Sequence, residues 1–320
     1  MKTLLKVLLS SLGLLSLLAV VGYVYIYLLP KGPEKTISGP LADGKSSFVI
    51  DAHRGKGKKS IRVWSYKPRQ WASGDKILFV MHGAGRNAED YLDAWVDAAQ
   101  VNNALLLAPE FASQFSRVIT NDYGEGNLFT YFGAKNPRDE WAITVVENIF
   151  DYVVQQNVLT NTSYDIFGHS AGGQFVQRMV MLSPNAKINT AVAANAGSYL
   201  FPDDSVSYPY GMSRTGLDQR DVGEAFKKDL VIMLGELDNT AGQGILDQTE
   251  PAMMQGPHRL ARGKALYSQA ARLAAANQLA FNWKIEIVKG VGHNFRAMSD
   301  YGARVLWGTA ESGSRERASE

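Results

Sequence analysis

Eight short apolar runs alternate along the chain with longer segments of helical pattern. The runs are SFVIDA (47–52), SIRVWSY (60–66), KILFVMH (76–82), ALLLAP (104–109), YDIFG (164–168), TAVAANA (190–196), DLVIMLG (229–235) and WKIEIV (283–288). Runs of four or more consecutive apolar residues are typical of strands that are covered on both faces of a parallel sheet. The segments between the runs predict helices over 88–100, 138–157, 170–182, 258–278 and 297–307. The alternation therefore predicts an α/β fold with right-handed crossovers.

The first two runs are separated only by HRGKGKK (53–59). A connection this short is too short for a parallel crossover, which needs a dozen or more residues. We therefore expect the first two strands to form an antiparallel hairpin at one edge of the sheet.

The N-terminal segment 7–30 is mostly Leu, Val and Tyr and carries no charge, and Lys2 and Lys6 precede it. About 20 helical residues suffice to cross the hydrocarbon core of a membrane. The two lysines favour a cytoplasmic N-terminus with the rest of the chain translocated. We expect an uncleaved membrane anchor, with the following domain periplasmic or extracellular.

A cleaved signal peptide, followed by secretion, is the alternative for this segment. Signal peptides have an apolar core of about 7–15 residues and a small-residue cleavage site. The core here is longer, and the stretch after Ala19 offers no clean A-x-A. Tyr23, Tyr25 and Tyr27 crowd its far end, where aromatic rings suit a membrane interface.

The chain divides by composition into four parts. We expect a transmembrane or signal helix at 1–30, a linker rich in Gly, Pro, Ser and Lys at 31–46, the α/β domain at 47–307 and a polar tail at 308–320.

Composition and charge exclude several classes of function. The formal net charge of +2 over 320 residues implies no large field of one sign, so nucleic acid is not an expected partner. The absence of cysteine excludes disulfides, a catalytic thiol and thiolate metal sites. The Asp and His residues show no metal-ligand spacing such as H-E-x-x-H, so we expect neither a metal nor an organic cofactor. The oligomeric state is left open.

The pentapeptide Gly168-His169-Ser170-Ala171-Gly172 matches G-x-S-x-G, after a predicted strand and before a predicted helix. This is the context of a nucleophile elbow, in which a sharp turn lifts the serine hydroxyl above the carboxyl edge of a sheet. We therefore expect Ser170 to be a nucleophile. Such a hydroxyl is weak unless an imidazole takes its proton and a carboxylate orients that imidazole.

The chain has five histidines, at 53, 82, 169, 258 and 293. His293 lies in the glycine-rich GVGHNF (290–295), a few residues after the last predicted strand, and is the expected base. The others lie in a basic turn, in the loop after the third strand, beside the serine itself and at the start of a long helix. We expect His82, in the loop after the third strand, to support that loop rather than to carry protons.

The expected acid is Asp238, three residues past the strand DLVIMLG. Glu236 is its competitor, and Asp247 and Glu250 are more distant alternatives. The resulting order of nucleophile, acid and base matches that of α/β-hydrolases.

A tetrahedral intermediate also needs two N–H donors for its oxyanion. The backbone N–H of Ala171 can give one. The loop HGAGRN (82–87), after the third strand, is expected to give the other through Ala84, with Gly85 as the alternate.

Together these residues make residues 45–307 resemble the α/β-hydrolase superfamily, and more closely its esterase and polyhydroxyalkanoate-depolymerase-like branch. The phrases that carry the resemblance are HGAGRNAEDY (82–91), LAPEF (107–111), GHSAGGQFVQR (168–178), AANAGSY (193–199), GELD (235–238) and GVGHNF (290–295). The resemblance implies a mostly parallel eight-stranded sheet and the roles of nucleophile, acid and base for Ser170, Asp238 and His293. It also implies a secreted or envelope-exposed hydrolase.

The chain departs from the depolymerases of that branch in two ways. They typically have a cysteine beside the oxyanion position, where this chain has Ala84, and they carry added binding domains for which no segment remains here. These departures argue against polymer degradation.

Two segments are expected to shape specificity: 201–226, between the sixth and seventh strands, as a small cap, and 240–263, after the acid, where Met254 and Arg259 could line an acyl pocket. Tyr123 and Asn127, in the segment 111–133, could lie on the rim. The expected activity is hydrolysis of a small-molecule or acyl-ester substrate through an acyl-enzyme. Peptide or amide hydrolysis by the same triad is the alternative, and a catalytically silent, membrane-tethered binding protein is a third reading.

Overall fold

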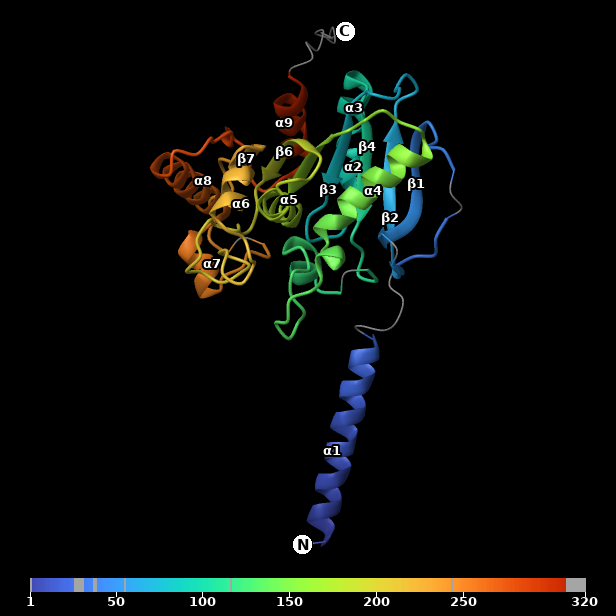
Figure 1. Cartoon of the computed structure of the whole chain (residues 1–320), viewed down its shortest axis with the longest axis vertical. Helices are drawn as coiled ribbons and strands as arrows, with labels where there is room; N and C mark the ends of the chain where they lie inside the picture. Colours follow the sequence, from blue (N-terminus) through green and yellow to red (C-terminus); the bar gives the residue numbers. More distant parts are fainter. Residues whose placement is uncertain are drawn as a thin grey trace, which may run out of the picture.

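A computed structural model describes residues 2–25, 32–36, 39–54, 56–115, 117–242 and 244–308 (Figure 1). Of the predicted polar tail 308–320, residue 308 is described, and 309–320 lie outside the described residues. The N-terminal helix stands apart from an α/β domain, as Figure 1 shows.

The N-terminal helix α1 spans Lys2–Tyr23. Its segment Lys6–Tyr23 is long and apolar enough to cross a membrane, with a mean hydropathy of 1.8, and none of it is buried by the rest of the chain. Length and composition of this kind fit a signal peptide or a membrane anchor.

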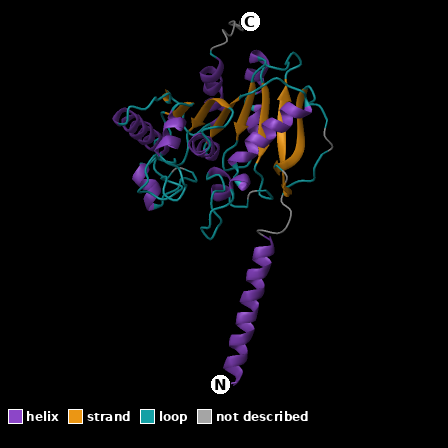
Figure 2. Cartoon of the chain, viewed as in Figure 1, coloured by secondary structure: helices purple, strands orange, loops and turns teal. Residues whose placement is uncertain are grey.

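The domain is built on a sheet of eight strands in the order β1-β2-β4-β3-β5-β6-β7-β8 (Figure 2). The strands are β1 (Gly44–His53), β2 (Lys56–Lys67), β3 (Ile77–Met81), β4 (Leu105–Glu110), β5 (Tyr164–His169), β6 (Ile188–Ala194), β7 (Asp229–Gly235) and β8 (Lys284–Val288). Strands β3 to β8 are mutually parallel, whereas β2 is antiparallel to both β1 and β4. The predicted fold class and the predicted hairpin at one edge are confirmed.

Helices cover both faces of the sheet. They are α2 (Ala88–Asp93), α3 (Val96–Asn102), α4 (Ile143–Gln156), α5 (Ala171–Leu182), α6 (Gln219–Phe226), α7 (Glu250–Gln255), α8 (Arg259–Ala276) and α9 (Phe295–Trp307), with short helical turns η2 (Thr120–Gly124) and η3 (Arg138–Glu140).

Successive side chains of each central strand point to opposite faces of the sheet, so each strand contributes side chains to two separate apolar layers. Phe79 packs in the layer under α4, α5, α6 and α8, whereas Leu78 and Val80 pack in the layer under α2, α3 and α9. All five residues of β3 are buried. This double coverage explains why the central strands are continuously apolar in the sequence.

The two short helices α6 and α7 were not predicted from the sequence. In α6, the Asp218 side chain accepts hydrogen bonds from the N–H groups of Arg220 and Asp221, and the Asp221 side chain accepts one from Asp218 N–H. This is a capping box made of two aspartates, a variant of the usual Ser/Thr and Glu pair. The pattern D-x-x-D was the available signal.

Strands β3 to β8 end at one edge of the sheet, called the carboxyl edge here, and begin at the opposite, amino edge. Long segments leave the carboxyl edge after β4 (111–142), after β6 (195–218) and after β7 (236–258). The β1–β2 turn lies at the same edge, because Arg62, at the middle of β2, pairs with Glu110 at the end of β4, and the first half of β2 extends beyond that pair.

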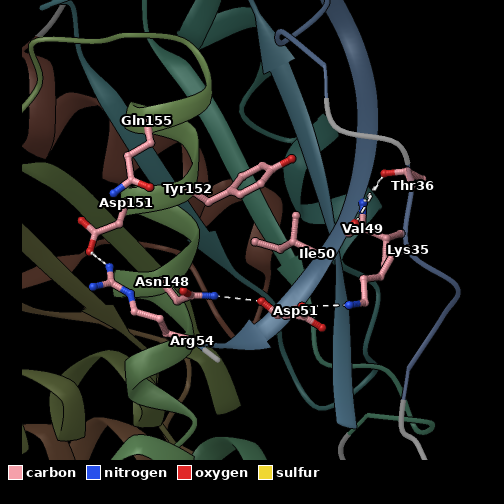
Figure 3. Close-up of a pocket in the computed structure, with 10 residues that line it drawn as sticks. All are labelled: Lys35, Thr36, Val49, Ile50, Asp51, Arg54, Asn148, Asp151, Tyr152 and Gln155. Atoms are coloured by element: carbon pink, nitrogen blue, oxygen red, sulfur yellow. Dashed lines mark hydrogen bonds and ion pairs between the residues drawn. The ribbon is translucent and has the colours of Figure 1, made fainter. Parts of the chain in front are cut away.

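The described part of the predicted linker contacts the sheet. Thr36 pairs with Val49 of the edge strand β1 through two hydrogen bonds, from Thr36 N–H to the carbonyl oxygen (3.3 Å) and from Val49 N–H to Thr36 Oγ1 (2.9 Å). Figure 3 shows this stretch beside a cavity of about 480 Å³ between β1 and α4, in which the charged groups pair with one another, Lys35 with Asp51 and Arg54 with Asp151.

We expect Phe79→Ala to lower the free energy of unfolding by about 3–5 kcal/mol, because it opens a cavity in a close-packed layer. Phe79 is fully buried and its ring packs edge-on against Tyr164, with 4.8 Å between centroids. Urea unfolding of the full chain in detergent measures the change. The exposed control Val101→Ala should stay within about 0.5 kcal/mol of wild type, and equal losses in both variants would contradict the assignment of Phe79 to the core.

Candidate active site

Ser170 occupies the turn that joins the end of β5 to the start of α5. Its backbone has φ 60° and ψ −118°, a conformation that side-chain-bearing residues rarely adopt. The turn is held by backbone hydrogen bonds from Ser170 N–H to Ala194 O and from Gln174 N–H to Ser170 O, each 3.0 Å long. The strain is thus fixed by the neighbouring strand and by the first turn of the helix.

Two glycines allow this turn to pack closely. A Cβ atom on Gly168 would lie 2.2 Å from the carbonyl oxygen of Gly172, and one on Gly172 would lie 2.2 Å from the carbonyl oxygen of Met81. Neither contact can be relieved by a side-chain movement, since both involve backbone atoms. The two glycines of G-x-S-x-G are therefore required by the approach of the helix to β5 and β3.

The structure brings Ser170, His293 and Asp238 into contact at the carboxyl edge. His293 Nε2 lies 3.1 Å from Ser170 Oγ, and His293 Nδ1 lies 2.7 Å from Asp238 Oδ2. Asp238 is buried in the loop after β7, and His293 lies between β8 and α9. In this arrangement the carboxylate can orient the imidazole, and the imidazole can take the proton of the hydroxyl.

Asn195 holds the acid and histidine loops together. Its side-chain oxygen accepts a hydrogen bond from Gly235 N–H (2.7 Å), and its amide donates to Gly292 O (3.0 Å). Its backbone lies in the left-handed region (φ 44°), which asparagine tolerates better than most residues. Asn195 lies in the phrase AANAGSY, but its role was not predicted from the sequence.

Arg259 lies behind the acid rather than on the rim of the site. Its Nη1 is 3.2 Å from Asp238 Oδ1, the oxygen that His293 does not contact, and both side chains are almost wholly buried. Asp238 is therefore held between a guanidinium and an imidazole. The expected acyl-pocket contact through Arg259 is replaced in the structure by this pairing.

The loop after β3 passes directly over Ser170. A Cβ atom on Gly83 would lie 3.6 Å from the Cβ of Ser170, and Ala84 and Gly85 follow in the same turn. On the other side, Ala171 begins α5, whose first N–H groups have no partner within the helix. The two expected sources of oxyanion donors thus flank the hydroxyl.

Tyr91 connects this loop to the nucleophile turn. Its hydroxyl lies 2.9 Å from His169 Nδ1 and also makes a hydrogen bond with the backbone of Gly83, and its ring stacks on Phe295 at 4.3 Å. The ring of His169 lies 4.5 Å from that of His293. Burial holds the pKa of His169 well below its ordinary value, so His169 stays neutral beside His293.

His82 supports the same loop from inside, as expected. Its Nδ1 lies 2.8 Å from Gly83 O, and its Nε2 accepts a hydrogen bond from Phe111 N–H (3.0 Å). Tyr123, expected on the rim, is fully buried beneath it and donates to His82 O at 2.9 Å. Tyr123 therefore supports the loop and has no exposed surface to offer a substrate.

The two further expected substrate contacts lie in the segments that follow β4 and β7. Asn127 donates to Glu140 O (2.9 Å) and accepts from Asn136 within the segment that follows β4. Met254 lies on α7 with 78% of its surface exposed.

We expect Gly172→Ala to lower the free energy of unfolding by about 1–3 kcal/mol or more, because the added methyl group overlaps backbone oxygen atoms of Met81 and His82. Gly223→Ala, within α6, is the matched control. Its added methyl group would meet only the side chain of Leu279, at an ordinary contact distance of 3.6 Å. The control should raise stability by about 0.5–1 kcal/mol. Urea unfolding compares the two, and a neutral Gly172→Ala would show that the elbow is not tightly packed.

Burial lowers the pKa of His82 from its ordinary 6.5 to about 4, and Arg86 nearby adds to this effect. Since the folded protein holds this imidazole neutral, the associated stability is complete above about pH 6.5 and is lost as the pH falls toward 4. We expect a loss of about 3 kcal/mol over this window. Unfolding curves measured across the window should be less pH-dependent in His82→Gln, whereas parallel profiles would contradict this role.

A scan against protein-family models finds no match, and a search of the curated proteins finds none either. Among solved structures, poly(aspartic acid) hydrolase-1 from Sphingomonas sp. KT-1 is 37% identical, with a TM-score of 0.80 over 83% of this chain and 100% of that chain. A poly(3-hydroxybutyrate) depolymerase from Bordetella parapertussis is 28% identical, with a TM-score of 0.78 over 83% of this chain and 91% of that one.

A fluorophosphonate-binding serine hydrolase from Staphylococcus aureus shares the fold at 15% identity, with a TM-score of 0.52 over 82% of this chain and 97% of that one. The missing binding domain no longer argues against polymer substrates, because this chain covers 91% of the solved chain of a poly(3-hydroxybutyrate) depolymerase. The departure at Ala84 stands. With the likeness to the Sphingomonas hydrolase extending over that protein's full solved chain, this protein belongs to the serine hydrolases of the α/β-hydrolase superfamily, in its esterase and depolymerase-like branch.

Proposed function

We propose that the protein hydrolyses carboxylic esters through an acyl-enzyme on Ser170. His293 is the base, and the Asp238 carboxylate orients His293. The observation that carries this proposal is the placement of one imidazole between the serine hydroxyl and a buried carboxylate, at 3.1 Å and 2.7 Å. These are hydrogen-bond distances at which a proton can pass from the hydroxyl to the ring.

In the first step, Ser170 Oγ bonds to the ester carbonyl carbon while its proton moves to His293 Nε2. The carbonyl oxygen becomes an oxyanion, held by the N–H groups of Ala171 and of Ala84, or of Gly85 as the alternate. The intermediate collapses, the carbon–oxygen bond to the alcohol breaks, and His293 gives its proton to the leaving alcohol. Water then repeats the sequence on the acyl-serine and releases the acid.

The buried charges suit this cycle. When His293 carries the proton, the Asp238 carboxylate beside Nδ1 stabilises the imidazolium. Arg259 on the other oxygen compensates the buried carboxylate, whose charge would be costly if it were unpaired. The neutral state of His169 avoids a second positive charge against the face of His293.

Amide hydrolysis by the same residues is the second candidate. It is favoured by the name of the 37% identical protein, a poly(aspartic acid) hydrolase, whose substrate is a polyamide. An amine must be protonated as it leaves, and His293 would carry the required proton. The depolymerase relative supports the ester class instead, so both polymeric and small-molecule substrates belong in the test.

We also propose that α1 anchors the protein, with the hydrolase domain at 47–307 outside the cytoplasm in the periplasm or extracellular space. The support is the length and apolar character of α1 and the position of Lys2 and Lys6 before its apolar core. Secretion after cleavage of this segment is the alternative.

A fluorophosphonate probe tests the proposed nucleophile directly. We expect wild type to be labelled and Ser170→Ala to be unlabelled, because the probe needs an activated serine. The variant should also lose ester hydrolysis by at least about 10⁴-fold. Ser73→Ala, a serine at the amino edge, is the control and should behave as wild type. Labelling that persists in Ser170→Ala would place the nucleophile elsewhere.

A substrate panel then separates the two candidates. It contains p-nitrophenyl esters of increasing chain length, aminoacyl anilides, poly(aspartic acid) and poly(3-hydroxybutyrate). The ester proposal expects a higher kcat/KM for esters than for amides. Efficient cleavage of anilides and poly(aspartic acid) with only weak ester hydrolysis would favour the second candidate.

A further inference from the structure

The described part of the linker joins the chain to the carboxyl edge of the sheet, the edge that holds Ser170. Pro33 O accepts a hydrogen bond from the Ser60 hydroxyl. Ser60 pairs with Asp51 near the β1–β2 turn, which lies at the carboxyl edge. Within residues 32–36, the chain therefore contacts the sheet at its carboxyl edge, and the Thr36–Val49 pairing carries the chain onward along β1.

Covalent geometry limits how far this edge can lie from the end of α1. Six residues, 26–31, separate Tyr25 from Gly32. Fully extended, this stretch reaches about 25 Å. The guanidinium of Arg117, in the segment after β4, lies 3.6 Å from the centroid of the Tyr25 ring, so the end of α1 contacts a carboxyl-edge segment. Figure 1 shows α1 leaving on the side of the green segment after β4 and of α7.

Among the described residues, the three most exposed large apolar side chains on carboxyl-edge segments are Phe132, Ile245 and Met254. Phe132, in the segment after β4, is 86% exposed, and Ile245 and Met254, in the segment after β7, are 92% and 78% exposed. Single exposed apolar side chains are ordinary on a protein surface. These three are set apart by their exposure and by lying on segments that leave the same edge of the sheet.

Hydrogen bonds order the backbone of the segments that carry Phe132 and Ile245. Phe132 lies in a tight turn closed by hydrogen bonds from Gly133 N–H to Thr130 O and from Thr130 N–H to Ala134 O. The buried Arg262 donates to Asp247 O at 2.8 Å and so ties the segment of Ile245 to α8. Rigid presentation lowers the entropic cost of inserting such side chains into a partner.

We infer that the carboxyl edge docks on the surface of a lipid bilayer through Phe132, Ile245 and Met254, and that the active site takes its substrate from that surface. A bilayer is the occupant because the end of a membrane-length helix must lie within about 25 Å of this edge. Aromatic and aliphatic side chains insert favourably at the headgroup boundary. The substrate part rests on the proposed ester hydrolysis, and the docking rests on α1 being an anchor.

The lack of cysteine allows a direct test in the full chain. Phe132→Cys, Ile245→Cys and Met254→Cys are labelled singly with an environment-sensitive fluorophore and reconstituted into phosphatidylcholine vesicles. Val101→Cys and Val158→Cys are matched controls, because these valines are 67% and 87% exposed and lie before β4 and β5, at the amino edge.

Docking predicts a several-fold higher emission at the three carboxyl-edge positions than at the two controls, and quenching by spin-labelled lipid at those three positions only. Equal, water-like emission at all five positions would overturn the inference. Emission that rises with protein concentration but resists the lipid quencher would point to a protein partner and would also overturn it.

Activity separates failure of docking from failure of the proposed function. Phe132→Ser and Ile245→Ser should keep wild-type kcat/KM on a water-soluble ester and lose several-fold on a long-chain ester presented in vesicles. Equal losses on both substrates would contradict docking. A wild-type protein inactive on every ester would refute the proposed function, while the fluorescence result would still decide the docking.

Discussion

The close approach of the β5–α5 turn to the backbone of β3 is the constraint on which the site depends. Gly168 and Gly172 leave room for no side chain, and Ser170 takes a strained backbone conformation that the neighbouring strand and helix hold in place. Because the turn cannot relax, the hydroxyl has a fixed position above the sheet. The start of α5 and the loop after β3 lie next to it, and we propose that their N–H groups hold the oxyanion of a substrate.

The parallel strands bring the remaining groups to this hydroxyl. Asp238 and His293 follow β7 and β8, and Asn195 joins their two loops through its side-chain amide. Behind them, Arg259 pairs with the acid, and the neutral His169 packs against the base. The same edge carries the exposed apolar side chains and receives the chain from α1. Catalysis and membrane attachment are thus proposed for one side of the molecule.

Much of this arrangement could be predicted from the sequence, because strand periodicity and the glycine spacing of the elbow are local signals. The eight strands, the antiparallel hairpin and the meeting of Ser170, Asp238 and His293 follow from such signals and from the rule that parallel strands end at one edge. The roles of Arg259, at the start of α8, and of Tyr123, in η2, could not be predicted, because a single polar side chain gives no local sign of whether it turns outward or inward. Only packing decides that Arg259 pairs with Asp238 and that Tyr123 lies beneath the loop after β3.

Localising a trapped acyl group tests the central claim most directly. The full chain is mixed with p-nitrophenyl butyrate, quenched in acid during turnover, digested and sequenced by tandem mass spectrometry. The account predicts a butyryl group on Ser170 that accumulates when deacylation is slow. Sustained turnover with no acylated peptide, or with the acyl group on another residue, would contradict it.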